Sequence, residues 1–319
     1  MPVFYRNIMY KPGEESEDAA CLKLYDGHDW KWFRAGLLHT DMEYLRRHWS
    51  GKKSSAPVLE KRHQKYFLRF SYTEEVTLSK TPVKDQLICS VDLGINTDAV
   101  CSIIRSDGTV LDRKFINFPS EKDRLSHVLG RIRRFQKEHG SKQIGSRWAY
   151  AKRLNTELAR KTARSIAEYA HENHADVIVF EYLEMKGKIS GKKRQKLHLW
   201  KKREVQTMCE HKAHRYGIRV SRVCAWNTSR LAYDGSGPVS RDPKNHSLCV
   251  FQSGKQYNCD LSASYNIGAR YWIREIIKTL PETERSSLEA KVPAVKRRTS
   301  CVYADLLILQ NEYGCSKAA

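Results

Sequence analysis

The sequence contains no Cys-x-x-Cys pair, no long apolar run and relatively few acidic residues. Its nine cysteines are scattered and odd in number, which argues against a disulfide framework and against an ordinary zinc ribbon. No stretch approaches the roughly 18 consecutive apolar residues of a membrane-spanning helix. The first residues, MPVFYRNIMYKPGEE, lack the apolar centre of a signal peptide. We therefore expect a cytoplasmic protein without a membrane partner.

The shortage of acidic residues leaves a strong positive charge. The chain has 57 Lys and Arg residues against 36 Asp and Glu residues, a formal net charge of +21. Nucleic acid is the first candidate partner, because neutralised phosphates supply most of the sequence-independent affinity. The basic residues are clustered, which favours this interpretation over a protein with a merely solvated basic surface. With 319 residues, 40% of them hydrophobic, the chain is long enough for two or three modest domains.

Apolar periodicity predicts a β-rich N-terminal region followed by an α/β core. Residues 65–78 alternate apolar and polar side chains as strands do, and residues 29–38 have a similar character. In the core, the Asp-Gly turn at 106–109 favours a hairpin between the apolar runs on either side. The expected core strands are 87–93, 99–105, 110–118, 177–180 and 218–224, and the expected helices are 121–139, 148–173, 203–216 and 260–280.

The order of these elements is that of an RNase H-like α/β fold, in which a hairpin precedes helices, further strands and a last helix. We expect an N-terminal β-rich, barrel-like domain and a small polar insert before the last helix of the core. The expected division is 1–85 for the N-terminal domain, 86–224 and 260–280 for the core, 225–259 for the insert and 281–319 for a C-terminal tail, a charged linker with a short apolar helix at 303–309.

Three acidic residues stand at the ends of core elements. Asp92 follows an apolar strand in CSVDLGIN, Glu181 follows another in DVIVFEYLE, and Asp260 opens the last helix in YNCDLSASYNIGAR. Sites in α/β sheets lie at strand ends, so we expect these carboxylates to converge. A carboxylate is costly to bury without a neutralising cation, and no basic partner is evident for the three. Taken singly, each fits an ordinary strand-end carboxylate, or for Asp260 an acid favoured by the helix dipole.

Three converging carboxylates suit a divalent metal, because hard oxygen ligands bind Mg²⁺, or Mn²⁺ in its place. Phosphodiester hydrolysis needs an activated water and a stabilised leaving oxygen, and two ions about 3.5–4 Å apart serve both needs. Asp92, on the expected central strand, is the candidate for the bridging ligand. Glu181 and Asp260 would each complete one coordination sphere. In so basic a chain, this trio predicts a metal-dependent nuclease.

In these three segments the chain resembles the RuvC-like nuclease of TnpB proteins, which accompany insertion sequences, and of the related type V CRISPR effectors. Asp92 in VDLGIN matches the first motif, an Asp followed by x-Gly-Ile, and Glu181 in VFEYLE matches the second, an apolar strand that ends in Glu before a Leu. Asp260 in DLSASYNIGAR matches the third motif, with Ser262 in place of the usual Asn and with Asn266 retained.

The chain departs from this family at the zinc ribbon, which the family carries between its last two motifs as two Cys-x-x-Cys pairs introduced by Thr-Ser. Thr228 and Ser229 remain, but Ala232 and Gly235 stand where cysteines are expected, and Cys249 is isolated downstream. Tetrahedral zinc needs four ligands at short spacing. We therefore predict no zinc, and the resemblance implies a target-strand-handling insert at a degenerate zinc-ribbon position.

The resemblance covers about residues 55–280. Relatives have a helical recognition domain within an N-terminal barrel, called the wedge, that binds RNA. Residues 1–85 resemble only the later part of that barrel, so the chain is either a natural minimal form or lacks a part. Aromatic and basic residues interleave in this region at Trp30, Lys31, Trp32 and Arg34. Such side chains stack on bases or ribose, but they also suit the core of a small barrel, and the pattern leaves both interpretations open.

Two further basic regions flank the expected acidic site. Residues 186–203 include nine Lys or Arg residues and no acid, directly after the Glu181 strand, which favours a lid that guides a strand to the carboxylates over a merely solvated loop. The preceding two helices carry basic residues that favour a duplex-binding channel. The expected nucleic-acid contacts in these regions are Arg131, Arg133, Arg134, Lys152, Arg153, Lys192, Lys193 and Arg194.

These observations favour an RNA-guided DNA endonuclease that uses Asp92, Glu181 and Asp260. The resemblance implies a guide RNA and target DNA as partners and a prokaryotic or phage-encoded source, and it leaves a homodimer open. One alternative is an RNA-guided DNA-binding regulator that does not cut, which the retained acids disfavour and the short N-terminal region favours. The other is a guide-independent junction nuclease of the same fold, which the aromatic and basic N-terminal region disfavours.

Overall fold

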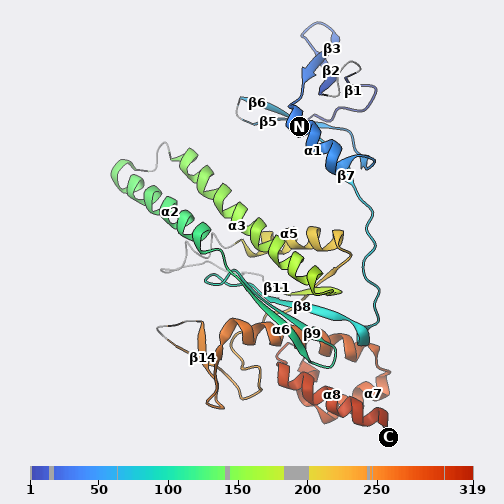
Figure 1. Cartoon of the computed structure of the whole chain (residues 1–319), viewed down its shortest axis with the longest axis vertical. Coiled ribbons are helices and arrows are strands. Elements are labelled where there is room, and N and C mark those ends of the chain that lie inside the picture. The colour runs from blue at the N-terminus through green and yellow to red at the C-terminus, as the bar shows by residue number, and fades with distance from the viewer. Residues whose placement is uncertain are drawn as a thin grey trace. The chain divides into compact units, whose positions relative to one another are not determined.

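The computed structural model describes residues 2–13, 18–62, 64–140, 144–182, 201–242, 245, 247–297 and 299–318. The chain forms two compact units, Met1–Val76 and Thr77–Ala319 (Figure 1). No helix in this described part of the chain is both long enough and apolar enough to cross a membrane. The division into domains by sequence places its first boundary at 85 rather than 76, and that finer division stays a prediction.

The first unit contains three small antiparallel sheets and one helix. Its core consists of Phe4, Tyr10, Ala20 and Leu22. The strands are β1 (Tyr10–Pro12), β2 (Ala19–Tyr25) and β3 (Trp30–Gly36) in one sheet, β4 (Lys53–Ser54) with β7 (Tyr72–Thr73), and β5 (Val58–Arg62) with β6 (Lys65–Arg69). The β-rich expectation is thus met in part, but these described strands close no barrel, so the barrel-like domain is not confirmed.

The helix of this unit, α1 (His39–Trp49), was not predicted from the sequence. None of its residues is buried, and a helix without a buried face leaves no apolar stripe at helical spacing to be recognised.

The second unit is built on a five-stranded mixed sheet in the order β10-β9-β8-β11-β12. The strands are β8 (Leu87–Asp92), β9 (Ala99–Arg105), β10 (Val110–Ile116), β11 (Val177–Tyr182) and β12 (Arg219–Cys224). The first three form an antiparallel meander, and β11 pairs in parallel with both β8 and β12. This order and these directions are those of the expected RNase H-like core.

Helices cover both faces of this sheet. Figure 1 shows α2 (Pro119–His139), α3 (Gly145–Glu172) and α5 (Lys202–Arg215) on one side, and α6 (Cys259–Thr279), α7 (Glu282–Lys291) and α8 (Tyr303–Ala318) on the other. Successive strand residues alternate between the two cores: Ile88 packs on the α6 side and Cys89 on the α3 side. Strands buried on both faces are continuous apolar runs, which is why their positions were predictable.

Helix α6 lies unusually close to the sheet. A Cβ added at Gly268 would come within 2.6 Å of the Ile104 side chain and 3.2 Å of Ser90 Oγ. The Ser102 and Ser264 hydroxyls also hydrogen-bond across this contact at 2.6 Å. Small residues therefore allow the helix that carries Asp260 to approach the strand that carries Asp92.

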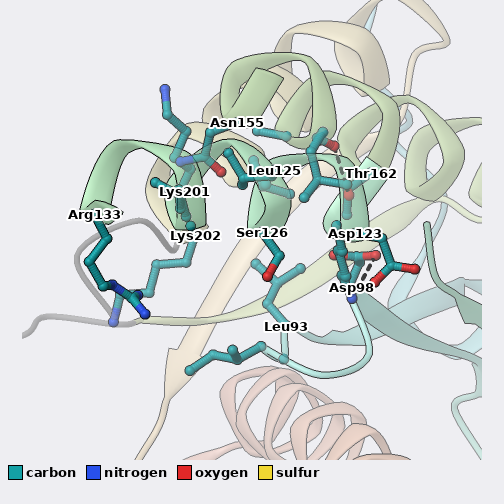
Figure 2. Close-up of a pocket in the computed structure, with 18 residues that line it drawn as sticks. Leu93, Asp98, Asp123, Leu125, Ser126, Arg133, Asn155, Thr162, Lys201 and Lys202 are labelled. Atoms are coloured by element: carbon teal, nitrogen blue, oxygen red, sulfur yellow. Dashed lines mark hydrogen bonds and ion pairs between the residues drawn. The ribbon is translucent and has the colours of Figure 1, made fainter. Parts of the chain in front are cut away.

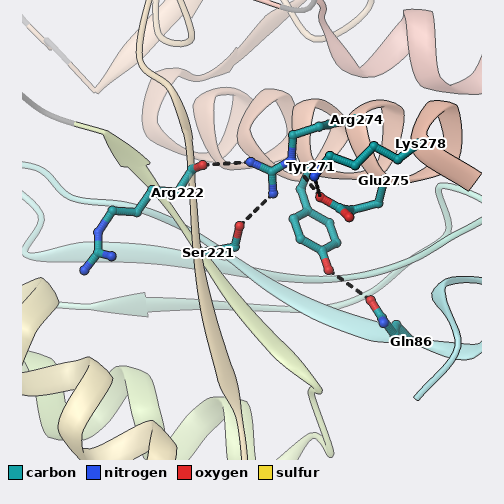
Figure 3. Close-up of polar contacts among 7 residues, drawn as sticks. All are labelled: Gln86, Ser221, Arg222, Tyr271, Arg274, Glu275 and Lys278. Carbon is teal, nitrogen blue, oxygen red and sulfur yellow. Dashed lines mark hydrogen bonds and ion pairs between the residues drawn. The ribbon is translucent and has the colours of Figure 1, made fainter. Parts of the chain in front are cut away.

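Polar contacts also fix α6 against the strands (Figure 3). Arg274 donates from Nη1 to the Arg222 carbonyl at 2.9 Å and from Nη2 to Ser221 Oγ at 2.7 Å, both in β12. The Tyr271 hydroxyl donates to Gln86 Oε1 at 2.9 Å, just before β8. These bonds satisfy polar groups at the sheet and fix the rotation of α6 about its axis.

The C-terminal region is more ordered than a charged linker with a short helix. Leu288 of α7 and Leu306 and Leu309 of α8 are buried against α6, and α8 extends well beyond the expected 303–309. The linker expectation is wrong because the apolar residues of α7 are few and widely spaced. Their burial depends on α6, which the local sequence does not reveal.

Candidate active site

Asp92 and Glu181 lie side by side at one edge of the sheet. The register of β8 and β11 pairs Val91 with Phe180, so the next residues along these parallel strands are Asp92 and Glu181. Alternation along each strand directs both toward the α6 face. Asp260 lies in the first turn of α6 on that same face. The structure thus brings the three predicted acids together, and their catalytic role stays a prediction.

Asp92 interacts electrostatically with both of the other acids. It is 8% exposed, and burial is the main reason that its pKa is raised well above the ordinary range. The negative charges of Glu181 and Asp260 raise this pKa further, and Arg241 lowers it. A buried carboxylate beside two others is energetically unfavourable without added positive charge. Asp92 is therefore the place where a cation would be most stabilising.

Glu181 is held by several groups at once. Burial raises its pKa, while a hydrogen bond from the Thr228 hydroxyl and the charges of Arg270 and Lys202 oppose that rise. Its backbone carbonyl accepts a bond of 2.9 Å from Gln206 Nε2 of α5. Thr228 belongs to the Thr-Ser pair noted in the sequence. Its hydrogen bond to Glu181 gives this threonine a role at the acidic site that does not depend on zinc.

Asp260 is positioned by the start of α6 and by the loop after β8. Asn258 caps the helix, its side chain accepting a bond of 2.9 Å from the Leu261 amide. Burial raises the pKa of Asp260, whereas Arg241 and a hydrogen bond with Thr97 lower it. A Cβ at Gly94 would lie 2.5 Å from the Thr97 carbonyl oxygen. The glycine of the Asp-x-Gly-Ile motif therefore permits the tight loop that brings Thr97 to Asp260.

The expectation that these acids lack basic partners is wrong. Arg241 of β13 (Ser240–Arg241) acts on Asp92 and Asp260, and Arg270 and Lys202 act on Glu181. These cations come from the insert, from a later turn of α6 and from α5, so no local sequence pattern pairs them with the acids. They do not complete the neutralisation, because the pKa of each acid remains raised.

The donor set suits Mg²⁺ in its chemistry, since it consists of buried carboxylate oxygens at a strand edge. In the described part of the chain, no group of three or more His, Cys, Asp or Glu side chains is arranged to hold one ion. The coupling of Asp92 is pairwise, with Glu181 and with Asp260.

The described part of the insert folds around a small apolar core. Its strands are β13, β14 (Leu248–Val250) and β15 (Gln256–Asn258). Ala232, Cys249, Phe251 and Cys259 form the buried centre, with Tyr233, Val239 and Tyr257 around it. Lys255 lies over the Tyr233 and Tyr257 rings at 5.0 and 5.2 Å. Methyl, thiol and aromatic groups thus occupy the centre of the insert.

We predict that purified protein contains much less than one zinc per chain. The insert has no Cys-x-x-Cys pair to supply ligands at the short spacing that tetrahedral zinc needs. Cys224 is exposed at the end of β12 rather than buried as Cys249 and Cys259 are. Elemental analysis after dialysis measures the metal. About one zinc per chain, lost on replacing Cys249 and Cys259 by serine, would contradict the prediction.

The predicted aromatic and basic group of the first unit lies on an exposed face. Trp30 and Trp32 are 50% and 40% exposed, so the interpretation that places them in a barrel core is wrong. Lys11 lies 5.0 Å from the centre of the Trp32 ring, and Lys31 pairs with Asp26 at 2.7 Å. Arg34 is also exposed on β3. The contribution of this face to nucleic-acid binding stays a prediction.

The basic residues of α2 and α3 lie on different faces of the helical hairpin. Arg131 lines a hollow with Arg124, His127, Arg147 and Tyr150, and no carboxylate is among the residues that line it. Arg124 donates to the Tyr150 hydroxyl at 2.7 Å. Arg133 lines a second pocket, on the other side of α2. The remaining predicted contacts on these helices, Arg134, Lys152 and Arg153, are exposed.

The other predicted contacts, Lys192, Lys193 and Arg194, lie outside the described residues, as does most of the expected lid. Local sequence alone did not single out Arg241, Arg270, Lys202 and Thr97 as neighbours of the acids. A signal in the sequence was the presence of the polar residues Asn266 and Arg270 at positions i and i+4 of the helix that Asp260 opens. Asn266 donates to the Thr228 and Leu231 carbonyls at 3.0 and 2.9 Å, so it attaches the insert to α6.

Residues 203–267, from α5 through the insert to the middle of α6, match a family model described as the TNB domain of Cas12f1-like proteins. Over 247 residues the chain is 25% identical to a TnpB-like protein of Aquifex aeolicus (strain VF5), covering 70% of this chain and 79% of that protein. It is 28% identical over 204 residues to TnpB-like protein ORF457 of Acidianus two-tailed virus, covering 58% of this chain and 42% of the viral protein.

In sequence the chain is thus similar to TnpB-like proteins, and its residues 203–267 are similar to the TNB domain of Cas12f1-like proteins. The crystal structure of the AacC2c1–sgRNA binary complex has a similar fold, with a TM-score of 0.50 at 10% identity over 83% of this chain. The chain spans 54% of the AacC2c1 chain and 42% of the viral relative. The family match at residues 203–267 includes the insert and the motif of Asp260. The insert is the segment that lacks the paired cysteines of a zinc ribbon.

Proposed function

We propose that the protein is an RNA-guided DNA endonuclease that hydrolyses phosphodiester bonds at Asp92, Glu181 and Asp260. The observation that carries the proposal is the convergence of three carboxylates from β8, β11 and α6 at one edge of the sheet, with Asp92 coupled to both others. Burial raises the pKa of each of these carboxyl groups, which supports a site that gains stability from a bound cation. Such a site is costly to maintain unless a cation or a reaction requires it.

The residues around the acids support distinct tasks in this reaction. In this proposal Asp92, Glu181 and Asp260 would bind Mg²⁺ ions, which would supply an activated water and stabilise the leaving oxygen. Thr228 and Gln206 fix the orientation of Glu181, and Thr97 fixes that of Asp260. Arg241, which acts on both aspartates, is placed to attract the phosphate of a nucleic-acid strand toward them.

The net positive charge of the chain and its similarity to nucleic-acid-binding proteins indicate its partners. The net charge of +21 and the arginine-lined hollow between α2 and α3 suit a sugar-phosphate backbone. AacC2c1, which shares the fold, is seen in a complex with sgRNA. In RNA-guided systems base pairing supplies sequence specificity and the protein holds the backbone. We therefore assign a guide RNA and a DNA target as the partners of this chain.

We expect a discrete, structured RNA to copurify with the protein, bound through residues 1–85 and the basic helices between Arg131 and Arg164. Non-specific contacts weaken steeply with ionic strength, so the purification must include a high-salt wash. Replacing both Trp30 and Trp32 by alanine should reduce the retained RNA about tenfold or more, since each stacked base contributes about 1–3 kcal/mol. Quantifying and sequencing the bound RNA measures this.

Trp226, 67% exposed in the insert, provides the matched control, and its alanine variant should retain the RNA. The recovered RNA should then direct Mg²⁺-dependent cleavage of a DNA that carries its complement. Heterogeneous RNA that washes away, together with cutting of branched DNA without a guide, would instead support a junction nuclease. Guided binding without cutting would support a regulator.

A further inference from the structure

A pocket of about 470 Å³ lies at the same edge of the sheet as the acids but on its opposite face. It is enclosed by the loop after β8, by α2 and α3, and by the start of α5 (Figure 2). Leu93 and Gly94, the two residues that follow Asp92, form one wall. Lys202, whose charge acts on Glu181, forms another. The acids and this pocket are therefore neighbours, because residues that line the pocket directly follow Asp92 or act on Glu181.

The pocket has an apolar middle and two ends of opposite character. Leu125, Leu129 and Leu158 are among its apolar residues, and none of the described residues that line it is aromatic. Figure 2 shows Arg133 and Lys202 extending toward one another at one end, and Asp98 and Asp123 at the other.

At the acidic end of the pocket, Asp98 already interacts with other residues of the protein. It pairs with Lys122 at 3.0 Å and accepts a bond of 2.9 Å from the Phe118 amide. Asp123 is exposed on the first turns of α2. Asp123 is therefore the acceptor at this end that a ligand can use.

This polarity matches a nucleotide. Its phosphate suits Arg133 and Lys202, its flat base suits the apolar middle, and its amino group suits Asp123, because carboxylates accept from exocyclic amines such as that of cytosine. The volume lies within the range of about 300–1,000 Å³ typical of small-ligand sites. A free strand crossing the edge of the sheet would place one phosphate at the acids and a neighbouring base at this pocket.

We propose that the pocket binds one base of the DNA strand, turned out of its stack beside the phosphodiester that is to be cut. This inference rests on the proposed nuclease function and adds a specific subsite to it. Turning out a base of a single strand costs only a few kcal/mol or less. Its capture would set the register of the strand, so that the neighbouring phosphate stays at Asp92 while water attacks.

Gly130 of α2 allows a clean test. It lines the pocket, and a Cβ built there meets no atom within 4 Å. Gly130→Phe is therefore expected to place a ring in the pocket, since its Cβ has open space, and replacing a glycine within a helix favours the helix in either variant. Gly130→Ala is the matched control, because it gives the same helical benefit and leaves the pocket open. Thermal unfolding of both variants checks that the fold is intact.

The probe is a single-stranded pyrimidine oligonucleotide with one 2-aminopurine, scanned through successive positions and saturated with the full-length protein. At one position the wild-type protein and Gly130→Ala should increase the 2-aminopurine fluorescence several-fold, since the base leaves its stack for a pocket without aromatic rings. Gly130→Phe should show no increase and should bind that oligonucleotide about tenfold more weakly.

Equal fluorescence with Gly130→Phe and Gly130→Ala, or no increase at any position for a strand that is bound by the wild type, would overturn the proposal. The binding readout needs no cutting. Loss of all DNA cleavage with the fluorescence change retained would refute the nuclease function and leave the base pocket in place. Cleavage that is insensitive to Gly130→Phe would refute the pocket and leave the nuclease in place.

Discussion

Asp92→Ala, Glu181→Ala and Asp260→Ala should each abolish Mg²⁺-dependent DNA cleavage, by about a thousandfold or more, while nucleic-acid binding persists. Asp92 should be the most sensitive, because it is coupled to both other acids and is the candidate bridge between two ions. Cleavage assays at saturating protein, with binding measured in parallel at the same salt, give the result. Full cutting by Asp92→Ala would remove this mechanism.

Metal binding at this site has a second readout that does not depend on cutting. Mg²⁺ or Mn²⁺ at ten times its Kd should raise the unfolding free energy of the wild type by about 1.4 kcal/mol, and Asp92→Asn should lose this increase. Thermal unfolding with and without the ion measures it. Glu157→Gln, on the exposed face of α3, should respond like the wild type.

Without a bound metal ion, the ionised Asp92 carboxylate should destabilise the folded protein. Burial raises the pKa of Asp92, so the charged form is less stable in the folded state. The free energy of unfolding should then fall as pH rises from about 4, the ordinary value for Asp, toward neutrality. Asp92→Asn should lack this part of the decrease, and at neutral pH it should be at least as stable as the wild type. A variant that is much less stable would show that the Asp92 carboxylate is structural.

Arg270→Met should lower the unfolding free energy of the chain by about 3 kcal/mol or more. Arg270 is 2% exposed, and it donates from Nε to the Cys301 carbonyl at 2.9 Å and from Nη1 to the Cys224 carbonyl at 2.7 Å. It therefore holds the end of β12 and the segment before α8 against α6, and its charge favours ionised Glu181. Methionine fills a similar volume but leaves the buried Cys301 carbonyl and the partly buried Cys224 carbonyl without this donor.

Urea unfolding followed by circular dichroism measures the change. Arg160→Met is the control, because Arg160 is exposed on α3, where it pairs with the surface residue Glu157 at 3.8 Å. It should change stability by less than about 0.5 kcal/mol. Arg270→Lys should also be destabilised, since one ammonium cannot reproduce two divergent guanidinium bonds. A loss below about 1 kcal/mol for Arg270→Met would show that the two contacts contribute little.

The sequence predicted those parts of the chain whose local pattern is strong. Strands β8, β9 and β11 are continuous apolar runs buried on both faces, and α3 and α6 have many buried residues at helical spacing. Helices α1 and α7 were missed because they bury no residue and one residue, respectively. The barrel expected in the N-terminal region came from a resemblance, and the small sheets observed there do not close it.

The sequence by itself determined the succession of strands and helices along the core, the three acids and the absence of Cys-x-x-Cys pairs, because each is a property of contiguous residues. Only the tertiary structure decided what surrounds the acids. Arg241, Arg270 and Lys202 reach them from three distant segments, and the pocket behind Asp92 is formed where α2, α3 and α5 meet. Electrostatic interactions and cavities depend on distances in space, and these arise only when the sheet aligns strands that are far apart in the chain.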